Sequence, residues 1–234
     1  MAAESRILVY DIEATNLDAD FGYVLAIGYK FLGDPASSTR VLSLDEFPRY
    51  EVDRTDDRQI LKAFEKVYLQ ADAILHYNGA RYDEPYVNTR RLIHGMDPLP
   101  RRPRIDLLYT AKSTFRMRGK SLDRVAKTLR TKNQKSPVAG HHWVRAMSGY
   151  RASLQYIVRH CRADVLVLEE VYMRLRGRVY NHPRVSSDLA ACRFCGGRVI
   201  SRGFALTALK NRPRRVQCTE CRAWDQRVEP KRAA

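Results

Sequence analysis

Hydrophobic positions near the N-terminus follow the short period of β-strands. The runs RILVYDIEA, YVLAIGYKFLG and TRVLSL are rich in β-branched and aromatic residues and predict three strands. The segment TNLDADFG between the first two is turn-like. A later run, AILHYNG, predicts a short buried strand that ends at an Asn-Gly pair. The chain therefore begins with a hairpin or meander.

Other segments carry the helical period. Apolar spacing predicts helices over 57–71, 83–94, 120–130 and about 153–175. Pro85 is compatible with the first turn of the second helix. IDLLYTAKS predicts a strand or the start of a helix, whereas 131–150, with Pro137, two glycines and HHW, is expected to be irregular. Strands followed by alternating strands and helices indicate an α/β domain.

The composition changes after the long helix. Segment 177–188 contains glycine, Asn-His-Pro and Ser-Ser, which is typical of a linker. We therefore expect a domain over 1–176, a linker over 177–188 and a small C-terminal module over 189–234. No apolar run reaches the ~18 residues of a membrane span, and MAAESR lacks a signal peptide's apolar stretch. A soluble cytoplasmic protein without a membrane partner is expected.

Basic residues exceed acidic ones by 42 to 26, which gives a net charge of +16. The excess is concentrated in two regions. Segment 112–135 carries nine basic residues with Asp123 as its one acid, and the chain from Gly177 onward carries 13 basic residues against 4 acidic ones. Basic side chains bind phosphates with release of counterions, so a nucleic-acid partner is favoured over a merely soluble basic protein.

Two acids lie in the first predicted strand. Asp11 and Glu13 point to the same face because side chains alternate along a strand. Their neighbours are apolar, and buried carboxylates are costly unless a cation compensates them. An Asp-x-Glu pair is nevertheless common, so the pair alone does not establish a site.

Further candidate groups lie at a helix start and on the long helix. Asp83 follows a predicted strand and begins a predicted helix, where a simple capping role is equally compatible. His160 and Asp164 are one helical turn apart and share a face, which is also the pattern of a solvated helix surface. Convergence of these carboxylates would suit a site for two Mg²⁺ or Mn²⁺ ions roughly 4 Å apart that hydrolyses phosphodiesters. The histidine would orient or deprotonate the attacking water.

Three segments carry a resemblance to a known family. DIEATNL resembles the first motif of DEDD-type 3′–5′ exonucleases, which have a ribonuclease H-like fold. YNGARYDEPYV is similar to their second motif, in the form seen in the proofreading domains of family B DNA polymerases. HCRADVLVLEEVY resembles the third motif, and the likeness covers about residues 5–176 in the expected order.

The resemblance implies a mixed sheet flanked by helices and a set of site residues. The implied metal ligands are Asp11, Glu13, Asp83 and Asp164. Ala14 and Leu17 fall where the family contacts the 3′-terminal nucleotide, with Leu17 as an apolar wedge, and Asn78 and Tyr82 are implied supports for the substrate strand.

The sequence departs from the family pattern in its third motif. Relatives with this second motif usually carry tyrosine four residues before the last aspartate, and another branch carries histidine five residues before it. Here His160 stands at the tyrosine's spacing, while Tyr156 lies too far upstream to replace it. We expect His160 to handle the attacking water; alternatively it only hydrogen-bonds Asp164.

Four of the five cysteines form two knuckles near the C-terminus. Cys192 and Cys195 are followed, after 22 residues, by Cys218 and Cys221. Two C-x2-C pairs suit one tetrahedral structural Zn²⁺, and Gly196 permits a tight turn after the first pair. A module of about 45 residues builds little core, so metal binding would supply its folding energy. The segment resembles a zinc ribbon, which is small and β-rich. Cys161 lies apart and is expected to pack as a small apolar side chain.

The ribbon is surrounded by basic and aromatic residues. Its predicted phosphate-binding residues are Arg193, Arg198, Arg202, Lys210, Arg212, Arg214 and Arg215. Phe194, Phe204 and Trp224 are candidates for base stacking, with core packing expected for at least one. Protein docking is the competing role.

Two functions of different classes remain. The first is a metal-dependent 3′–5′ exonuclease that releases nucleoside 5′-monophosphates from single-stranded ends, DNA being favoured. An endonuclease built on the same site is a variant of it. The second is a catalytically weak or inactive binding or scaffold protein that uses the basic ribbon. A polymerase or a repair or recombination protein is an expected partner of the enzyme.

Overall fold

The structure, a computed structural model, describes residues 5–134, 138–206 and 213–227. The chain forms two compact units. The first comprises Arg6–Arg174, and the second begins at Leu175 and includes Ser5.

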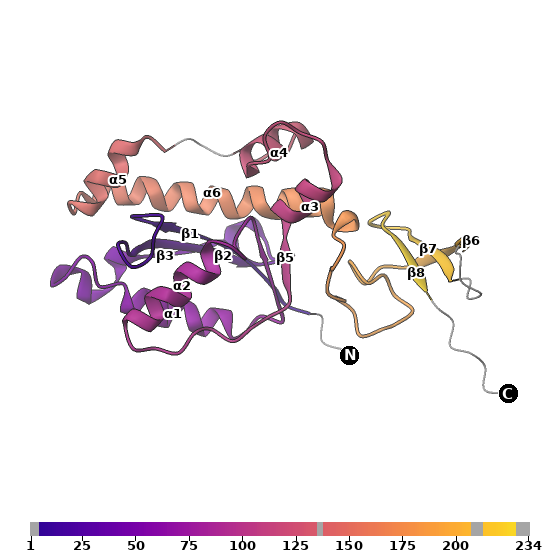
Figure 1. The fold of residues 1–234 in the computed structure, drawn as a ribbon, viewed down its shortest axis with the longest axis horizontal. Coiled ribbons are helices and arrows are strands. Elements are labelled where there is room, and N and C mark those ends of the chain that lie inside the picture. The colour runs from indigo at the N-terminus through magenta and orange to yellow at the C-terminus, as the bar shows by residue number, and fades with distance from the viewer. Residues whose placement is uncertain (1–4, 135–137, 207–212, 228–234) are drawn as a thin grey trace. The chain divides into compact units, whose positions relative to one another are not determined.

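The first unit is built on a five-stranded mixed sheet with the strand order β3-β2-β1-β4-β5 (Figure 1). Strands β1 (Ile7–Ala14), β2 (Val24–Phe31) and β3 (Arg40–Ser43) form an antiparallel meander. Strands β4 (Ala73–His76) and β5 (Arg104–Asp106) join the other edge of β1 in parallel. This confirms the predicted α/β class and the meander at its start.

Helices cover both faces of this sheet. Helix α6 runs along one face, and α1 and α2 lie on the other (Figure 1). The α-helices are α1 (Arg58–Tyr68), α2 (Asp83–Ile93), α3 (Leu107–Thr114), α4 (Leu122–Leu129), α5 (Gly140–Met147) and α6 (Arg151–Leu175). Short 3-10 helices span Ala36–Ser38, Leu44–Glu46, Pro48–Glu51 and Arg176–Arg178.

Strand β1 separates apolar from acidic side chains by its alternation. Tyr10 is buried, with its ring centroid 5.1 Å from that of Phe64 in α1. Asp11 and Glu13 belong to the opposite face, toward α6, because they are odd-numbered neighbours of Tyr10 and Ile12. The face of Tyr10 therefore supplies core packing, whereas the other face carries the buried Ile7 and Val9 followed by the two carboxylates.

Helix α6 approaches the sheet closely at Gly28. A Cβ atom at this position would lie 2.9 Å from Sγ and 3.0 Å from the carbonyl oxygen of Cys161. Gly28 pairs with Asp11 across β1 and β2, so the close contact lies beside the acidic face of β1. Cys161 is fully buried, which confirms its expected packing role.

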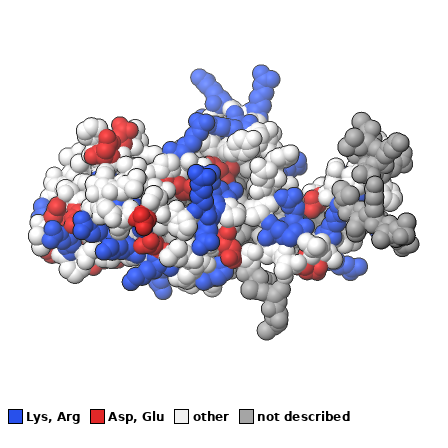
Figure 2. Space-filling model, turned by 60° about the horizontal axis from the view of Figure 1, so that its bottom comes forward, with Lys and Arg blue, Asp and Glu red and all other residues white. Residues whose placement is uncertain are grey.

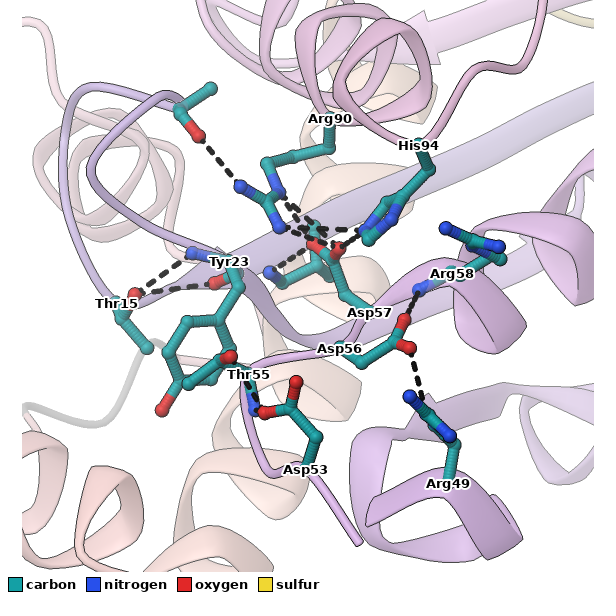
Figure 3. Close-up of polar contacts among 12 residues, drawn as sticks. Thr15, Tyr23, Arg49, Asp53, Thr55, Asp56, Asp57, Arg58, Arg90 and His94 are labelled. Atoms are coloured by element: carbon teal, nitrogen blue, oxygen red, sulfur yellow. Dashed lines mark hydrogen bonds and ion pairs between the residues drawn. The ribbon is translucent and has the colours of Figure 1, made fainter.

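A buried ionic cluster ties α2 to the segment before α1 (Figure 3). The carboxylate of Asp57 accepts hydrogen bonds from the Arg90 guanidinium at 2.9 Å and from the Val24 backbone N–H at 2.8 Å. Nε2 of His94 lies 2.6 Å from the same carboxylate. The guanidinium of Arg90 also donates to the carbonyl of Ala19, so the buried charges are hydrogen-bonded as well as paired.

The second unit contains a three-stranded antiparallel sheet in the order β6-β7-β8. Its strands are β6 (Val199–Phe204), β7 (Arg214–Cys218) and β8 (Trp224–Arg227). Its small core contains Cys192, Phe194, Cys218 and Ala223. The predicted β-rich module with four clustered cysteines is thus present.

One predicted element is wrong. Residues 140–147, within the segment expected to be irregular, form α5, and His141, His142 and Trp143 lie on this helix. Gly140 is the first residue of this helix and Gly149 lies beyond its end, so neither glycine interrupts the helix. IDLLYTAKS contributes both the end of β5 and helix α3. Among the described residues, no helix is long and apolar enough to cross a membrane.

Candidate functional site

The carboxylates of β1 meet side chains of α6. Glu13 is buried, and its Oε1 lies 3.6 Å from Nε2 of His160. The same Nε2 atom lies 3.4 Å from Oδ2 of Asp164, one turn further along α6. Ligand atoms of Glu13, His160 and Asp164 all lie within 4.8 Å of one another. Strand β1 and helix α6 thus contribute polar side chains to one buried cluster.

Asp11 stands next to this cluster. Ligand atoms of Asp11, Glu13 and Cys161 form a second group within 4.8 Å. The pKa of the Cys161 thiol is raised well above its usual range by burial, and the charges of Glu13, Asp11 and Asp164 add to this effect. The thiol is therefore protonated and makes a poor ligand beside three acids.

Asp83 reaches the site from the other direction. It is the first residue of α2, and its Oδ1 accepts a hydrogen bond from the backbone N–H of Ile12 at 3.1 Å. Burial raises the pKa of this carboxyl to about 6, against a lowering effect of His76 and of the Ile12 hydrogen bond. A buried carboxylate of raised pKa is a common feature of functional sites.

The turn between β4 and α2 presents Asn78 toward the same region. Asn78 has a φ of 68°, a left-handed conformation that asparagine tolerates better than most residues. Its backbone N–H donates to Oδ1 of Asp106 at 3.0 Å, and the same oxygen accepts from the N–H of Leu108 as an N-cap of α3. Asp106 therefore both caps a helix and supports the turn.

A cavity of about 560 Å³ opens over these groups. Six predicted site residues line it, namely Asp11, Glu13, Asn78, Tyr82, Asp83 and His160. Asp164 is buried and is not among the described residues that line the cavity, but its Oδ2 lies 3.4 Å from Nε2 of the lining His160. Ala14 and Leu17 are not among the described residues that line it; Leu17 is 80% exposed on the loop after β1.

Other lining residues were not predicted as site residues from the sequence. They are Ile12, Tyr77, Asp123, Lys127, Val138 and Trp143. A second cavity of about 440 Å³ shares Asp11, Tyr77 and Asn78 with the first and adds Lys112 and Lys120. The lysines belong to the basic segment 112–135, so its charge excess was a usable signal. Trp143 could have been found by reading Trp143, Ala146 and Met147 as one helical face.

Tyr156 does not take the place of the missing family tyrosine. Its ring stacks on that of His142, with centroids 4.3 Å apart and planes 7° apart. His160 is thus the group of α6 that faces Glu13 and Asp164.

The four C-terminal cysteines form a separate candidate metal centre. All four sulfur atoms lie within 4.8 Å of one another, and the pairs Cys192–Cys221 and Cys195–Cys218 are each 3.6 Å apart. Sulfur atoms about 2.3 Å from a tetrahedral zinc are about 3.8 Å from one another, so the arrangement fits this ion. Gly196, with a φ of 74°, makes the predicted tight turn. Burial acts to raise the pKa of Cys218, but N–H groups of Cys221 and Glu220 and neighbouring thiols outweigh it, leaving the pKa below its usual value.

The aromatic and basic residues of this module divide by exposure. Phe194 is buried in the small core, whereas Phe204 and Trp224 are 56% and 47% exposed. This confirms that at least one of the three aromatics serves packing. Lys210 and Arg212 lie outside the described residues.

Comparison with known families identifies the fold. Residues 8–176 match the family model described as the RNase_H superfamily. The chain belongs to the RNase_H superfamily. The chain is also similar to the solved structure of the family B DNA polymerase from the hyperthermophilic archaeon Pyrobaculum calidifontis, with a TM-score of 0.57 and 21% identity. The similarity covers 75% of this chain and 26% of the polymerase chain, and it concerns the fold. No curated protein matches the sequence.

Proposed function

We propose that this RNase H-like protein is a metal-dependent 3′–5′ exonuclease that hydrolyses phosphodiester bonds at single-stranded ends, with DNA favoured. The products would be nucleoside 5′-monophosphates. Membership of a superfamily of nucleases supports a nucleic-acid substrate, and the order and spacing of the three motifs support the exonuclease class. One observation above all supports this proposal. Ligand atoms of Glu13, His160 and Asp164 lie within 4.8 Å of one another, and Asp11, Glu13, Asp83 and His160 line one cavity.

The donor set suits hard divalent cations. Carboxylate oxygens are the ligands that Mg²⁺ and Mn²⁺ prefer, and Glu13, Asp83 and Asp164 are buried, where solvation is poor. We assign Asp11, Glu13, Asp83 and Asp164 as the ligands. When bound, two such ions would supply activation of the attacking water and stabilisation of the leaving oxygen.

His160 is assigned to the attacking water. Its Nε2 faces both Glu13 and Asp164, and the ring lines the cavity. The two carboxylates orient the imidazole, and a ring nitrogen at this position can accept the proton that the water releases.

Several residues are placed to hold the strand. Asn78 and Tyr82 line the cavity, and Tyr82 donates a hydrogen bond from its hydroxyl to the carbonyl of Asn16. The terminal nucleotide would contact Ala14 and the exposed Leu17 on the loop that this bond braces. Lys112 and Lys120, in the adjoining cavity, would meet the next phosphates. Figure 2 shows Lys and Arg side chains spread over the face in view, with Asp and Glu among them.

The Cys192–Cys195–Cys218–Cys221 cluster is proposed to hold one structural Zn²⁺. Four thiolates leave no open coordination position for catalysis. We further propose that the chain is organised as a nuclease domain over 1–176, a linker over 177–188 and a zinc ribbon over 189–234. A polymerase or a repair or recombination protein is the proposed partner.

The test is digestion of a single-stranded DNA oligonucleotide that carries a 5′ label, with Mg²⁺ or Mn²⁺. We expect a ladder that shortens stepwise from the 3′ end, and mononucleotide release from a 3′-labelled copy. Asp11→Asn should reduce the rate by a factor of about 10³ or more, because it removes a metal ligand at constant size. The exposed Asp34, on the loop after β2, supplies a control: Asp34→Asn should digest at the parental rate.

Other substrates separate the alternatives. Cleavage of circular single-stranded DNA would indicate an endonuclease, and faster digestion of a matched RNA would reverse the substrate preference. If no substrate is cut with either metal, or if Asp11→Asn digests like the parent, the proposal fails. Binding without cleavage would leave the scaffold function, which the His160 departure favours.

A further inference from the structure

The C-terminal unit has a cavity of its own, apart from the four-cysteine cluster. Its volume is about 440 Å³, within the range of small-ligand sites. Its walls come from the segment 177–180, from Arg193 and Phe194 of the first knuckle, and from strands β7 and β8.

One wall is a face of the three-stranded sheet. Arg215 pairs with Gln226, and Gln217 pairs with Trp224, so Arg215, Trp224 and Gln226 share one face. The Arg215 guanidinium carbon lies 4.8 Å from the centroid of the Trp224 ring. This arrangement holds a large aromatic ring and a cation together at the mouth of the cavity.

The aromatic surface is exposed and not part of the small core. Trp224 is 47% exposed, and Tyr180, which also lines the cavity, is 83% exposed. Phe194 lines the same cavity and is buried. Large exposed rings around a hollow are typical of surfaces that bind a partner.

The charge of the cavity favours an anion. Three arginines line it, and its one acid, Asp225, lies 3.9 Å from Arg193. Arg193 also donates a hydrogen bond to the carbonyl of His182 and so has a structural task. Arg178 and Arg215 are both exposed and are the cations placed to meet a ligand.

We propose that this cavity binds one nucleotide of a single-stranded nucleic acid. The base stacks against Trp224, with Tyr180 at the rim, and the adjoining phosphates contact Arg178 and Arg215. Stacking on exposed aromatics combined with arginine contacts to the backbone is how many proteins hold single strands without reading their sequence. The proposal stands independently of the nuclease activity, because every residue it uses belongs to the C-terminal unit.

The opposite face of the same sheet supplies a matched control. Arg214 and Phe204 pair directly across β6 and β7, and the guanidinium carbon lies 5.9 Å from the ring centroid. Arg214 is adjacent to Arg215 and therefore points to the other side of the strand. Neither Arg214 nor Phe204 is among the described residues that line the cavity.

Tryptophan emission provides a readout confined to this cavity. The chain has two tryptophans, Trp143 and Trp224. In the full chain carrying Trp143→Phe and Asp11→Asn, Trp224 is the one remaining tryptophan and hydrolysis is suppressed. We expect a twelve-residue oligothymidylate to quench its emission, with stronger binding at low salt. A matched oligouridylate distinguishes DNA from RNA as the source of the nucleotide.

Two further variants in this background test the assignment. Arg215→Gln should raise the oligonucleotide concentration for half-quenching by about fivefold or more, whereas Arg214→Gln should change it by less than about twofold. Replacement of Trp224 is followed in the Asp11→Asn chain by the fluorescence anisotropy of a labelled oligonucleotide. Trp224→Ala should lose affinity, and Trp224→Phe should keep most of it. The zinc content of each variant checks that its C-terminal unit is folded.

Several results would overturn the proposal. They are unquenched Trp224 emission at oligonucleotide saturation, equal shifts for Arg214→Gln and Arg215→Gln, and equal quenching by an oligoglutamate. The last outcome would indicate a site for acidic peptides. Because the readout is emission and not cleavage, failure here leaves the nuclease test unaffected, and the converse also holds.

Discussion

Nε2 of His160 lies 3.6 Å from Oε1 of Glu13, so a residue in the middle of a 25-residue helix faces a carboxylate from the first strand. Both side chains are buried. The contact therefore distinguishes His160 from a histidine that merely lies on a solvated helix surface. The spacing to Asp164 alone could not make that distinction.

His160→Ala is expected to lower the single-turnover rate at neutral pH by a factor of about 10², the lower end of general-base contributions. Substrate affinity should change by less than about threefold, because the cavity walls and the basic segment remain. The measurement is single-turnover digestion together with equilibrium binding. His141→Ala changes an exposed histidine on α5 and serves as the control. Equal rates for His160→Ala and the parent would make His160 a bystander.

Asp57→Asn is expected to destabilise the first unit by about 3 kcal/mol or more, because it leaves the buried Arg90 without its charge partner. The neighbouring Asp56 pairs with the half-exposed Arg49, so Asp56→Asn should cost about 1 kcal/mol or less. Urea unfolding of the two variants makes the comparison. Similar losses for both would mean that the buried cluster adds no more than a surface pair.

Local sequence patterns predicted much of the fold and of the site. Alternation placed Asp11 and Glu13 on one face, and helical spacing placed His160 and Asp164 on another, because both regularities depend on nearby residues alone. That the two faces meet followed only from family resemblance. Periodicity carries no information on which elements pack together.

What escaped prediction depends on contacts between distant segments. The cluster joins Asp57 to Arg90 and His94, which lie more than thirty positions later in the chain, and none of the three stands out within its own segment. The same holds for Trp143, which lines the cavity from a helix that glycine and proline signals had concealed. Tertiary packing likewise determines which of Phe194, Phe204 and Trp224 are exposed and which is buried.

Gly28→Ala is expected to weaken both stability and activity. The new Cβ would lie 2.9 Å from Sγ and 3.0 Å from the carbonyl oxygen of Cys161, and a backbone atom cannot move without the helix. Overpacking of this kind costs about 1–3 kcal/mol, and a shift of α6 would displace His160 and Asp164 from Glu13. Thermal unfolding and digestion rates test both effects.

The glycine at position 33 provides the control for Gly28→Ala. A Cβ there would meet nothing within 4 Å, but its φ of 88° disfavours alanine, so Gly33→Ala measures backbone strain without crowding. The stability of the Gly33→Ala variant should fall, whereas its digestion rate, measured at a temperature at which it is folded, should equal that of the parent protein. Adding Cys161→Ala to Gly28→Ala should recover part of the stability, because it removes the sulfur contact and leaves the carbonyl contact. Parental activity of Gly28→Ala would show that α6 need not lie this close to the sheet.

Removal of metal from the four-cysteine cluster is expected to unfold the C-terminal unit selectively. Among the described residues of this unit, the buried cluster consists of Cys192, Phe194, Cys218 and Ala223, and two of these are proposed ligands, so little apolar burial remains without the ion. Cys192→Ser should lower bound zinc from about one to well below one ion per chain and increase amide exchange throughout β6, β7 and β8. Cys161→Ser changes the fifth cysteine and should leave the zinc content unchanged. Amide exchange in β1, β2 and β4 should stay as in the parent, because the five-stranded sheet has its own core. A Cys192→Ser protein that retains protected strands in the second unit would show that this sheet is stable without the metal.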